Sequence, residues 1–325
     1  MFSLCRSPAS IVFLDDDPDF LETLALLLPS RWRYDFYLRP APLQERLETE
    51  AAAWTARVER RQAAVAGAGL GESLPARILR DWAEDGERYA LAGICVVDYS
   101  MPAMSGLEFL ERLPDWPGAR ILLTGRADEH IAVRAFNAGL IEQFIPKQGD
   151  DSAGRVARAI EQLMDGAQTR MGNPCRATLK PEQLRLLQHA SVAAELRRWV
   201  GESGWVEYVA LGEPFGLLGR DAAGRAGWLQ LEAPSELATV AELAASVGWS
   251  SQRVEQLGHG RGVTNLEFVL ALGEPGSAEV RQPFVLGTEG ELLAAFFEVP
   301  APQGEAPAGA YADFLARQPS RTLIR

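Results

Sequence analysis

Four short apolar runs in the first half of the chain constrain its fold more than any other feature. Each run has the length and the β-branched content of a buried strand, and amphipathic helical patterns separate the runs. Strands and helices that alternate in this way predict a parallel sheet covered by helices on both faces. The runs are residues 10–14, 94–97, 119–123 and 143–145, and Tyr34–Leu38 alternate as a further strand.

Each of the four runs ends at a residue with a charged or reactive side chain. In an open parallel sheet, the carboxyl ends of the strands meet at one edge, and ligands bind there. Crowded carboxylates repel one another and favour a bound divalent cation, and Mg²⁺ prefers oxygen ligands. A carboxylate can also accept a phosphoryl group, whose charge a lysine ammonium would stabilise. The residues at these strand ends are Asp15 and Asp16, Asp98, Thr124 and Lys147.

Lysine at the last strand end is informative, because the chain has 30 arginines and only two lysines, Lys147 and Lys180. A compact ammonium and a planar guanidinium bind different partners. Taken singly, each residue also has a purely structural interpretation. Acidic residues before Pro18 would cap a helix, Asp98 and Thr124 would be loop and turn residues, and Lys147 would be a surface charge.

Together, these motifs resemble the receiver domain of bacterial two-component response regulators over residues 10–167. The resemblance implies a flavodoxin-like fold, a doubly wound parallel sheet of five strands. The matching stretches are FLDDDPDF at 13–20, VVDYSMPAMSG at 96–106, LLTG at 122–125 and FIPK at 144–147.

The resemblance also implies a phosphorylation site. Asp98 would accept a phosphoryl group from a sensor histidine kinase or a phosphotransfer protein. Asp16, Asp98 and the carbonyl group of Ser100 would bind Mg²⁺, and Asp15 would complete the acidic pair. We therefore expect Mg²⁺ as the cofactor of a phosphorelay protein that carries an aspartyl phosphate.

Three further residues have switch roles by resemblance. Lys147 and Thr124 would contact the phosphoryl oxygens, and Phe144 would be the aromatic side chain that follows the threonine inward. Judged alone, Phe144 would be a core residue. One departure from the family pattern is Gln148, which stands where receivers commonly have proline after the lysine. It leaves the reactive groups in place, so we expect phosphorylation to be retained.

The second departure is the segment 41–90, which is longer than a usual crossover. Two arrangements fit it: a helical hairpin that projects from the domain, or an extended crossover helix folded onto the body. Either arrangement could supply a dimerisation surface. The pattern consists of near-heptad Leu47, Ala51, Trp54, Val58 and Val65, a break at Gly67, Gly69 and Gly71, and a second amphipathic stretch with Leu74, Ile78 and Trp82.

Residues 168–180 contain glycine, asparagine and proline and predict a linker between a first domain, 1–167, and a second, 181–325. The second domain is expected to be a small α+β domain. Its patterns are helical at 181–202, 235–247 and 250–258, strand-like at 205–211, 215–218 and 226–231, apolar at 266–272 and 291–299, and rich in Pro, Gly and Ala at 300–310.

For the output we favour interaction with a downstream protein or a small ligand. Trp205, Tyr208, Phe215 and Trp228 would line a concave sheet or would simply form the core. The alternative is a DNA-binding transcriptional regulator, because residues 240–257 have helix-turn-helix spacing. A recognition helix there would carry Arg253 as its only cation, beside Glu255, which argues against groove binding. We find no clustered histidine, cysteine or carboxylate motif in 171–325, and so expect no enzymatic output.

Composition bounds the remaining classes. The formal net charge is −12 and both halves of the chain are acidic, unlike a protein that binds phosphate backbones. No apolar run reaches the length of a membrane span, and the amino terminus lacks the features of a secretory signal. The three cysteines are scattered and indicate no disulfide framework. We expect a cytoplasmic protein without membrane partners, and a homodimer is left open.

Overall fold

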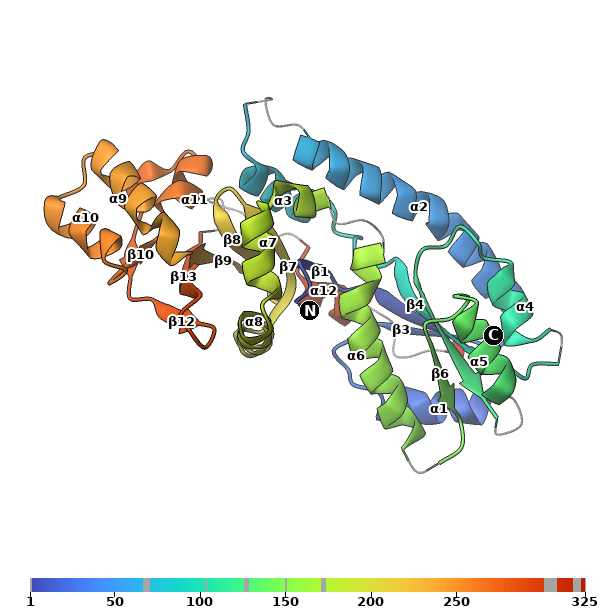
Figure 1. Cartoon of the computed structure of the whole chain (residues 1–325). Coiled ribbons are helices and arrows are strands. Elements are labelled where there is room, and N and C mark those ends of the chain that lie inside the picture. Colours follow the sequence, from blue (N-terminus) through green and yellow to red (C-terminus); the bar gives the residue numbers. More distant parts are fainter. Residues whose placement is uncertain are drawn as a thin grey trace. The chain divides into compact units, whose positions relative to one another are not determined.

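The computed structural model describes residues 2–66, 71–102, 104–125, 129–149, 151–170, 174–300, 309–317 and 323–324 (Figure 1). The chain divides into two compact units, and each is assembled from segments that are distant in the sequence. We call them the parallel-sheet unit, Ser7–Arg60, Glu87–Gly172 and Asp313–Arg325, and the antiparallel-sheet unit, Met1–Arg6, Arg61–Gly86 and Asn173–Ala312.

The parallel-sheet unit contains a six-stranded sheet in the order β14-β3-β2-β4-β5-β6, with every neighbouring pair parallel. The five neighbouring strands β3-β2-β4-β5-β6 have the doubly wound flavodoxin-like order, so the fold predicted from the sequence is confirmed. The sixth strand comes from the far end of the chain and was not predicted. The strands are β2 (Ser10–Leu14), β3 (Tyr34–Tyr37), β4 (Ala92–Asp98), β5 (Ala119–Thr124), β6 (Gln143–Pro146) and β14 (Leu323–Ile324).

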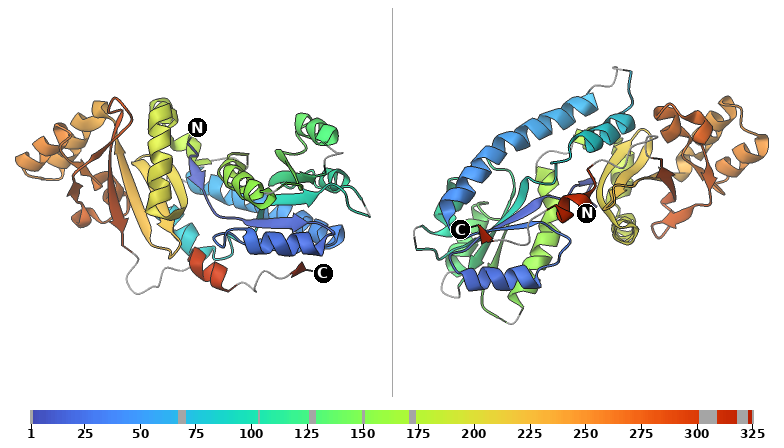
Figure 2. Two further views of the ribbon diagram at one scale, coloured as in Figure 1. Left: turned by 90° about the horizontal axis from the view of Figure 1, so that it is seen from below. Right: turned by 180° about the vertical axis from the view of Figure 1, so that it is seen from behind.

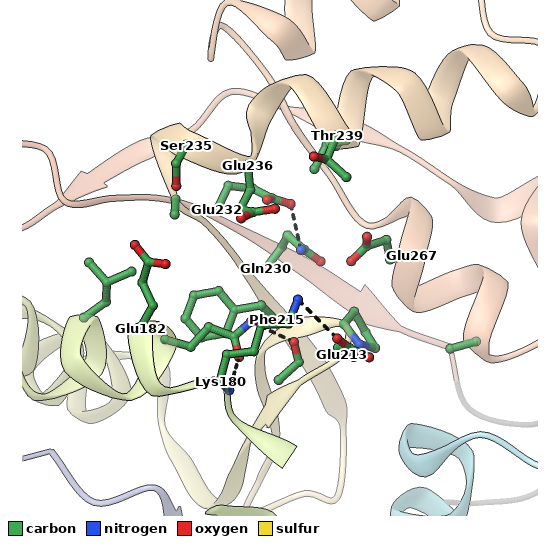
Figure 3. Close-up of a pocket in the computed structure, with 17 residues that line it drawn as sticks. Lys180, Glu182, Glu213, Phe215, Gln230, Glu232, Ser235, Glu236, Thr239 and Glu267 are labelled. Atoms are coloured by element: carbon green, nitrogen blue, oxygen red, sulfur yellow. Dashed lines mark hydrogen bonds and ion pairs between the residues drawn. The ribbon is translucent and has the colours of Figure 1, made fainter. Parts of the chain in front are cut away.

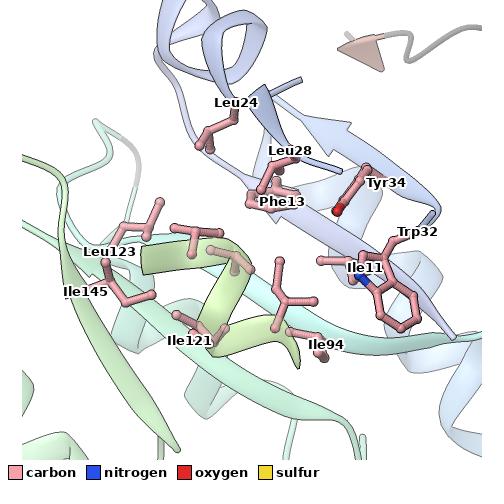
Figure 4. Close-up of a cluster of buried hydrophobic side chains, with 14 of the residues drawn as sticks. Ile11, Phe13, Leu24, Leu28, Trp32, Tyr34, Ile94, Ile121, Leu123 and Ile145 are labelled. Carbon is pink, nitrogen blue, oxygen red and sulfur yellow. The ribbon is translucent and has the colours of Figure 1, made fainter. Parts of the chain in front are cut away.

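Helices cover both faces of this sheet because its strands are apolar on both sides. One face packs against α1 (Pro18–Leu27) and α6 (Ser152–Arg170), which close over the cluster drawn in Figure 4. The other face packs against the first part of α2 (Pro40–Ala66), α4 (Gly106–Glu111) and α5 (Glu129–Asn137). Labelled members of the first cluster are Ile11, Phe13, Leu24, Leu28, Ile94, Ile121, Leu123 and Ile145.

The segment 41–90 forms two helices that pack in different units. In α2, Leu43, Leu47 and Trp54 are buried in the core of the parallel-sheet unit, and the Trp54 indole donates to the carbonyl of Ala92 at 3.1 Å. In α3 (Leu74–Glu84), Trp82 is buried in a core of the antiparallel-sheet unit. The segment therefore combines a crossover helix packed on the sheet with a second helix that belongs to the other unit. Of the three glycines at the predicted break, Gly67 and Gly69 lie outside the described residues.

The antiparallel-sheet unit contains a second six-stranded sheet, in the order β1-β7-β8-β9-β13-β12. Its β7-β8-β9 meander corresponds to the three strands predicted from the sequence, and the α+β class is confirmed. The strands are β1 (Cys5–Arg6), β7 (Trp205–Gly212), β8 (Phe215–Asp221), β9 (Ala226–Glu232), β12 (Phe284–Leu286) and β13 (Leu292–Val299).

Two layers of helices cover this second sheet. One face packs against α7 (Pro181–Gln188) and α8 (Ala190–Ser203), and the other packs against α3 and α11 (Leu266–Ala271). Figure 2 shows the helix pair α9 (Leu237–Ser246) and α10 (Ser251–Gly258) in orange at one end of the unit. The remaining elements are η2 (Pro174–Thr178), η3 (Pro234–Glu236), β10 (Val263–Thr264), η4 (Pro275–Ser277), β11 (Val280–Arg281) and α12 (Tyr311–Ala316).

Each end of the chain belongs to the unit that is formed mainly by the other half of the sequence. Strand β1, near the amino terminus, pairs with β7 in the antiparallel-sheet unit, and β14, near the carboxyl terminus, pairs with β3 in the parallel-sheet unit. The segment expected to be a linker, 168–180, contains the end of α6 and all of η2. Among the described residues, no helix combines the length and the apolar character that crossing a bilayer would require.

Candidate functional site

The first acidic group follows β2, where the backbone passes directly into α1. Asp17 is the N-cap of α1, and its Oδ1 accepts hydrogen bonds from the backbone N–H groups of Asp19 and Phe20 at 3.0 and 3.2 Å. Helix capping therefore explains Asp17 but not Asp15 or Asp16. The side chain of Asp15 is buried, and that of Asp16 is exposed.

Asp98 ends β4, the strand beside β2, and its side chain is only 4% exposed. Because the strand order reverses between β2 and β4, the carboxyl ends of these strands place the three aspartates together. Carboxylate oxygens of Asp15, Asp16 and Asp98 all lie within 4.8 Å of one another. Among the described residues, this is the one group of three or more acidic, histidine or cysteine side chains close enough to share a metal ion. Ser100 is exposed two residues after Asp98.

Lys147, at the end of β6, joins this acidic group. Its Nζ lies 2.7 Å from Oδ2 of Asp15 and 3.0 Å from Oδ1 of Asp98, and 4.8 Å from the centroid of the Phe20 ring. Burial raises the pKa of Asp15 to about 6, although the lysine ammonium acts in the opposite direction. Burial alone would lower the pKa of Lys147, but the two aspartates raise it above its usual value. The ammonium is therefore held protonated between two carboxylates.

Thr124 ends β5 and completes the edge. Its side chain is fully buried, and among the described residues its hydroxyl oxygen has no hydrogen-bond partner. A buried hydroxyl without a hydrogen-bond partner destabilises the folded state unless a ligand or water binds it. Phe144, on β6 opposite Leu122, is partly buried and packs against the core beneath α5. The structure thus brings all the predicted residues to one edge of the sheet, with Phe144 beside it.

Two features not predicted from the sequence hold this edge in place. Arg155 of α6 donates to the carbonyl oxygens of Pro146 and Gln148 at 3.0 and 2.9 Å, so it ties down the loop that carries the lysine. This loop carries Gln148, the position at which the resemblance seen in the sequence would place proline. Gly106 begins α4 so close to β4 that a Cβ atom there would lie 2.3 Å from the carbonyl oxygen of Asp98. No residue larger than glycine fits that position without moving β4.

The donor set fits a hard divalent cation. Three carboxylates on neighbouring loops offer oxygen ligands, one exposed side chain leaves room for water, and the unpartnered threonine hydroxyl lies at the same edge. Asp15, Asp16 and Asp98 would hold Mg²⁺, and Lys147 provides a second positive charge beside the same carboxylates.

The aromatic residues singled out in the second half are core residues. Trp205, Tyr208, Phe215 and Trp228 are all less than 9% exposed, which favours packing over an exposed aromatic lining. Trp228 stacks on Phe268 with ring centroids 4.5 Å apart.

The segment 240–257 does fold into two helices, α9 and α10, joined by a short turn. The basic side chains in and just after this segment make contacts within the unit. Arg253 lies over the Trp249 ring at 5.3 Å. Arg261, which follows α10, pairs with Glu255 at 3.3 Å.

Comparison with solved structures supports the fold of the whole chain. The response regulator LqsR of Legionella pneumophila matches 97% of this chain and 95% of its own, with 23% identity and a TM-score of 0.74. A CheY-like receiver domain protein from Methanospirillum hungatei matches 50% of this chain and 98% of its own, with 16% identity. An adenylate cyclase from Rhodopirellula baltica matches 50% of this chain and 93% of its own, with 18% identity. Both have a TM-score of 0.32, too low to carry an argument.

No protein-family model and no curated protein sequence matches the chain. The strand order and the structural similarity nevertheless agree with the resemblance seen in the sequence. The parallel-sheet unit has the receiver fold, and the chain as a whole shares the fold of a response regulator.

Proposed function

We propose that this protein is a phosphorylation-switched response regulator and that Asp98 is its phosphoryl acceptor. The observation that carries the proposal is Lys147, whose ammonium lies within 3.0 Å of both Asp15 and Asp98. The unpartnered hydroxyl of Thr124 at the same strand edge supports it. Phosphoryl transfer to a carboxylate uses an acidic acceptor and a fixed cation, and a free hydroxyl can donate a hydrogen bond to the transferred group.

The proposed reaction is an in-line displacement at phosphorus. A carboxylate oxygen of Asp98 attacks the phosphoryl group of a phosphohistidine on a sensor kinase or phosphotransfer protein. The new bond joins oxygen to phosphorus, the phosphorus–nitrogen bond breaks, and the departing imidazole keeps the electron pair and takes up a proton from water. Mg²⁺ bound by Asp15, Asp16 and Asp98, with the carbonyl of Ser100, would offset charge on the phosphoryl oxygens.

Phosphorylation would change the surroundings of two residues beside the acceptor. The Thr124 hydroxyl would donate to a phosphoryl oxygen, and Lys147 would exchange its contact with Asp98 for one with the phosphoryl group. Phe144, on the neighbouring strand, would then repack as Thr124 moves. A local charge change would in this way bias an element with two packed arrangements.

We propose further that the output is an interaction with a downstream protein or ligand. The acidic charge of the chain supports this, as do the contacts of Arg253 and Arg261 within the antiparallel-sheet unit. A DNA-binding output through 240–257 would instead require cations free to contact phosphates. Retention of the protein on DNA that weakens as salt is added would favour that alternative.

Intact-mass spectrometry after incubation with Mg²⁺ and acetyl phosphate tests the acceptor. We expect wild type and the control Asp115→Asn, which changes an exposed aspartate of the same unit, to gain one phosphoryl group. We expect Asp98→Asn to gain none, and EDTA to abolish the gain in wild type. A folded wild-type protein that gains nothing from acetyl phosphate and from a second donor would disprove the proposal.

A further inference from the structure

The antiparallel-sheet unit contains a cavity of about 390 Å³ with an unusual set of side chains (Figure 3). Its wall is built by the start of α7, the turn between β7 and β8, the end of β9, η3, α9 and α11. Cavities of this size hold small molecules. Because these segments are far apart in the sequence, no local motif marked the cavity. Its charged lining consists of Lys180, Glu182, Glu213, Glu232, Glu236 and Glu267.

The lining of the cavity therefore contains five carboxylates and one ammonium, and this ammonium is already paired with one of the carboxylates. Nζ of Lys180 lies 3.2 Å from Oε1 of Glu213, and the two side chains are 61% and 76% exposed, so the pair lies at the rim. The side chain of Glu267 is partly buried. Among the described residues, it has neither a hydrogen bond nor an ion pair. The interior of the cavity thus lacks a counter-charge.

Glu232 is the most deeply placed of these carboxylates, at 6% exposed. Its Oε1 accepts a hydrogen bond of 2.8 Å from Gln230, whose own Oε1 accepts one of 2.7 Å from the Trp228 indole. This chain of hydrogen bonds fixes the carboxylate in one orientation. Its other oxygen has no partner among the described residues. This oxygen is accessible to solvent and Glu232 lines the cavity, so the oxygen can accept a hydrogen bond from a ligand.

The pKa values agree with a missing cation. Burial, with a smaller contribution from the charge of Glu267, raises the pKa of Glu232 to about 8. Burial also raises the pKa of Glu267, where the charge of Glu213 adds to the effect and the charge of Lys180 acts in the opposite direction. Acidic side chains held in this way are destabilised in their charged form until a positive group joins them.

A bare metal ion is not the best occupant. Nowhere in the described antiparallel-sheet unit do three acidic, histidine or cysteine ligand atoms lie within 4.8 Å of one another, as they do around Asp98. The carboxylates are instead spread around a cavity that also has an apolar lining. Pro214, Phe215 and Val240 contribute to that lining. Spread charges and an apolar wall suit a larger ligand with a hydrocarbon body.

We propose that this cavity binds a small organic cation, a primary amine or guanidine attached to a short aliphatic or aromatic body. The charged group would bind the free oxygen of Glu232 and the carboxylate of Glu267, and the body would lie against Phe215. Charge-assisted hydrogen bonds of this kind are roughly twice as strong as neutral ones. The inference does not depend on phosphorylation of Asp98, and it gives the antiparallel-sheet unit a ligand of defined charge.

Calorimetric titration with agmatine, cadaverine and tyramine tests the proposal on the full-length protein. Millimolar Mg²⁺ is present throughout, so that the aspartate site has its own cation. Two variants each replace two glutamates with glutamine: E232Q/E267Q alters the cavity, and E274Q/E298Q alters exposed glutamates of the same unit. 1-Pentanol and glutarate serve as neutral and anionic probes.

We expect at least one amine to bind wild type at one site per chain, and E232Q/E267Q to weaken that binding at least tenfold. We expect E274Q/E298Q to change it less than twofold. If none of the amines binds wild type at millimolar concentration, the proposal is wrong. It is also wrong if E232Q/E267Q binds the amines as wild type does, or if glutarate binds better than they do. Should the double variant not fold, E267Q alone must weaken binding at least threefold.

Discussion

Both lysines of the chain lie beside carboxylates, but the two acidic sites differ in how their charge is balanced. In the parallel-sheet unit, Lys147 lies within 3.0 Å of two aspartates that are at most 5% exposed. In the antiparallel-sheet unit, Lys180 contacts only Glu213 at an exposed rim, and the acids inside the cavity have no cation. One site therefore contains its own counter-charge, and the other requires one from outside.

The difference suggests different uses of acidic groups. A fixed ammonium beside an acceptor prepares a site for an incoming anion, because the cation is already oriented before the phosphoryl group arrives. Unbalanced carboxylates in a cavity prepare a site for an incoming cation. The comparison predicts that loss of the lysine has a large effect at the first site and a small one at the second.

The largest expected effect is that of Lys147→Ala. Removal of the ammonium leaves Asp15 and Asp98 without a counter-charge and removes a cation from the phosphoryl group. We expect the rate of phosphorylation by acetyl phosphate to fall about 100-fold, in the range found when one preorganised donor is removed. Intact-mass time courses measure this rate. Lys147→Arg should recover little, because a planar guanidinium does not replace a compact ammonium. A rate within threefold of wild type in Lys147→Ala would show that the lysine has no part in transfer.

The second effect concerns the pH dependence of stability through Glu232. Its pKa is about 8 in the folded chain against an ordinary value of 4.5, because of burial and the charge of Glu267. The folded state thus binds the proton more tightly than the unfolded state, so the contribution of Glu232 is complete below about pH 4.5 and is lost as pH rises through about 8. Glu232→Gln should remove that loss and stabilise the protein on the order of 2 kcal/mol at about pH 9 relative to wild type.

Thermal unfolding at about pH 5 and about pH 9 measures this difference. The control is Glu298→Gln, an exposed residue at the end of β13, which should keep the pH dependence of wild type. If Glu232→Gln retains the full wild-type decline between the two pH values, the carboxylate is not held neutral by its surroundings.

A smaller effect is expected for Arg155→Ala, which removes the two hydrogen bonds to the loop around Lys147. The lysine would remain but its position would be less restricted, so we expect phosphorylation to slow severalfold while the final yield stays the same. Arg158→Ala is the matched control, because Arg158 lies one turn along the same helix and pairs only with exposed Asp151 among the described residues. Equal rates for the two variants would exclude a positioning role for Arg155.

The smallest effect is expected for Lys180→Met. Its pair with Glu213 is exposed, so its loss should change the free energy of unfolding by less than about 1 kcal/mol. Phosphorylation should proceed as in wild type. A large loss of stability would mean that the rim pair, and not the interior of the cavity, determines the local structure.

The sequence alone was sufficient to predict five strands of the parallel sheet and to place acidic, hydroxyl and lysine side chains at one edge of it. Strand residues and the reactive residues that follow them are adjacent in the chain, so the pattern at 10–16, 94–98, 119–124 and 143–147 predicted both the strands and the site. The order of parallel strands then brings their ends together by general rules of topology. The three strands between Trp205 and Glu232 were predicted for a similar reason, since hairpin partners are neighbours in the sequence.

Only the tertiary structure decided the rest, because the remaining contacts join distant residues. No pattern in the segment 41–90 could indicate that Trp54 and Trp82 are buried in different units. Nor could any local pattern indicate that β14 pairs with β3 near the other end of the chain. The acidic cavity is the clearest case, because Glu213, Glu232 and Glu267 come from three separate segments that meet only in the folded unit. Local chemistry follows from neighbouring residues in the chain, whereas a site built by long-range packing exists only in the folded protein.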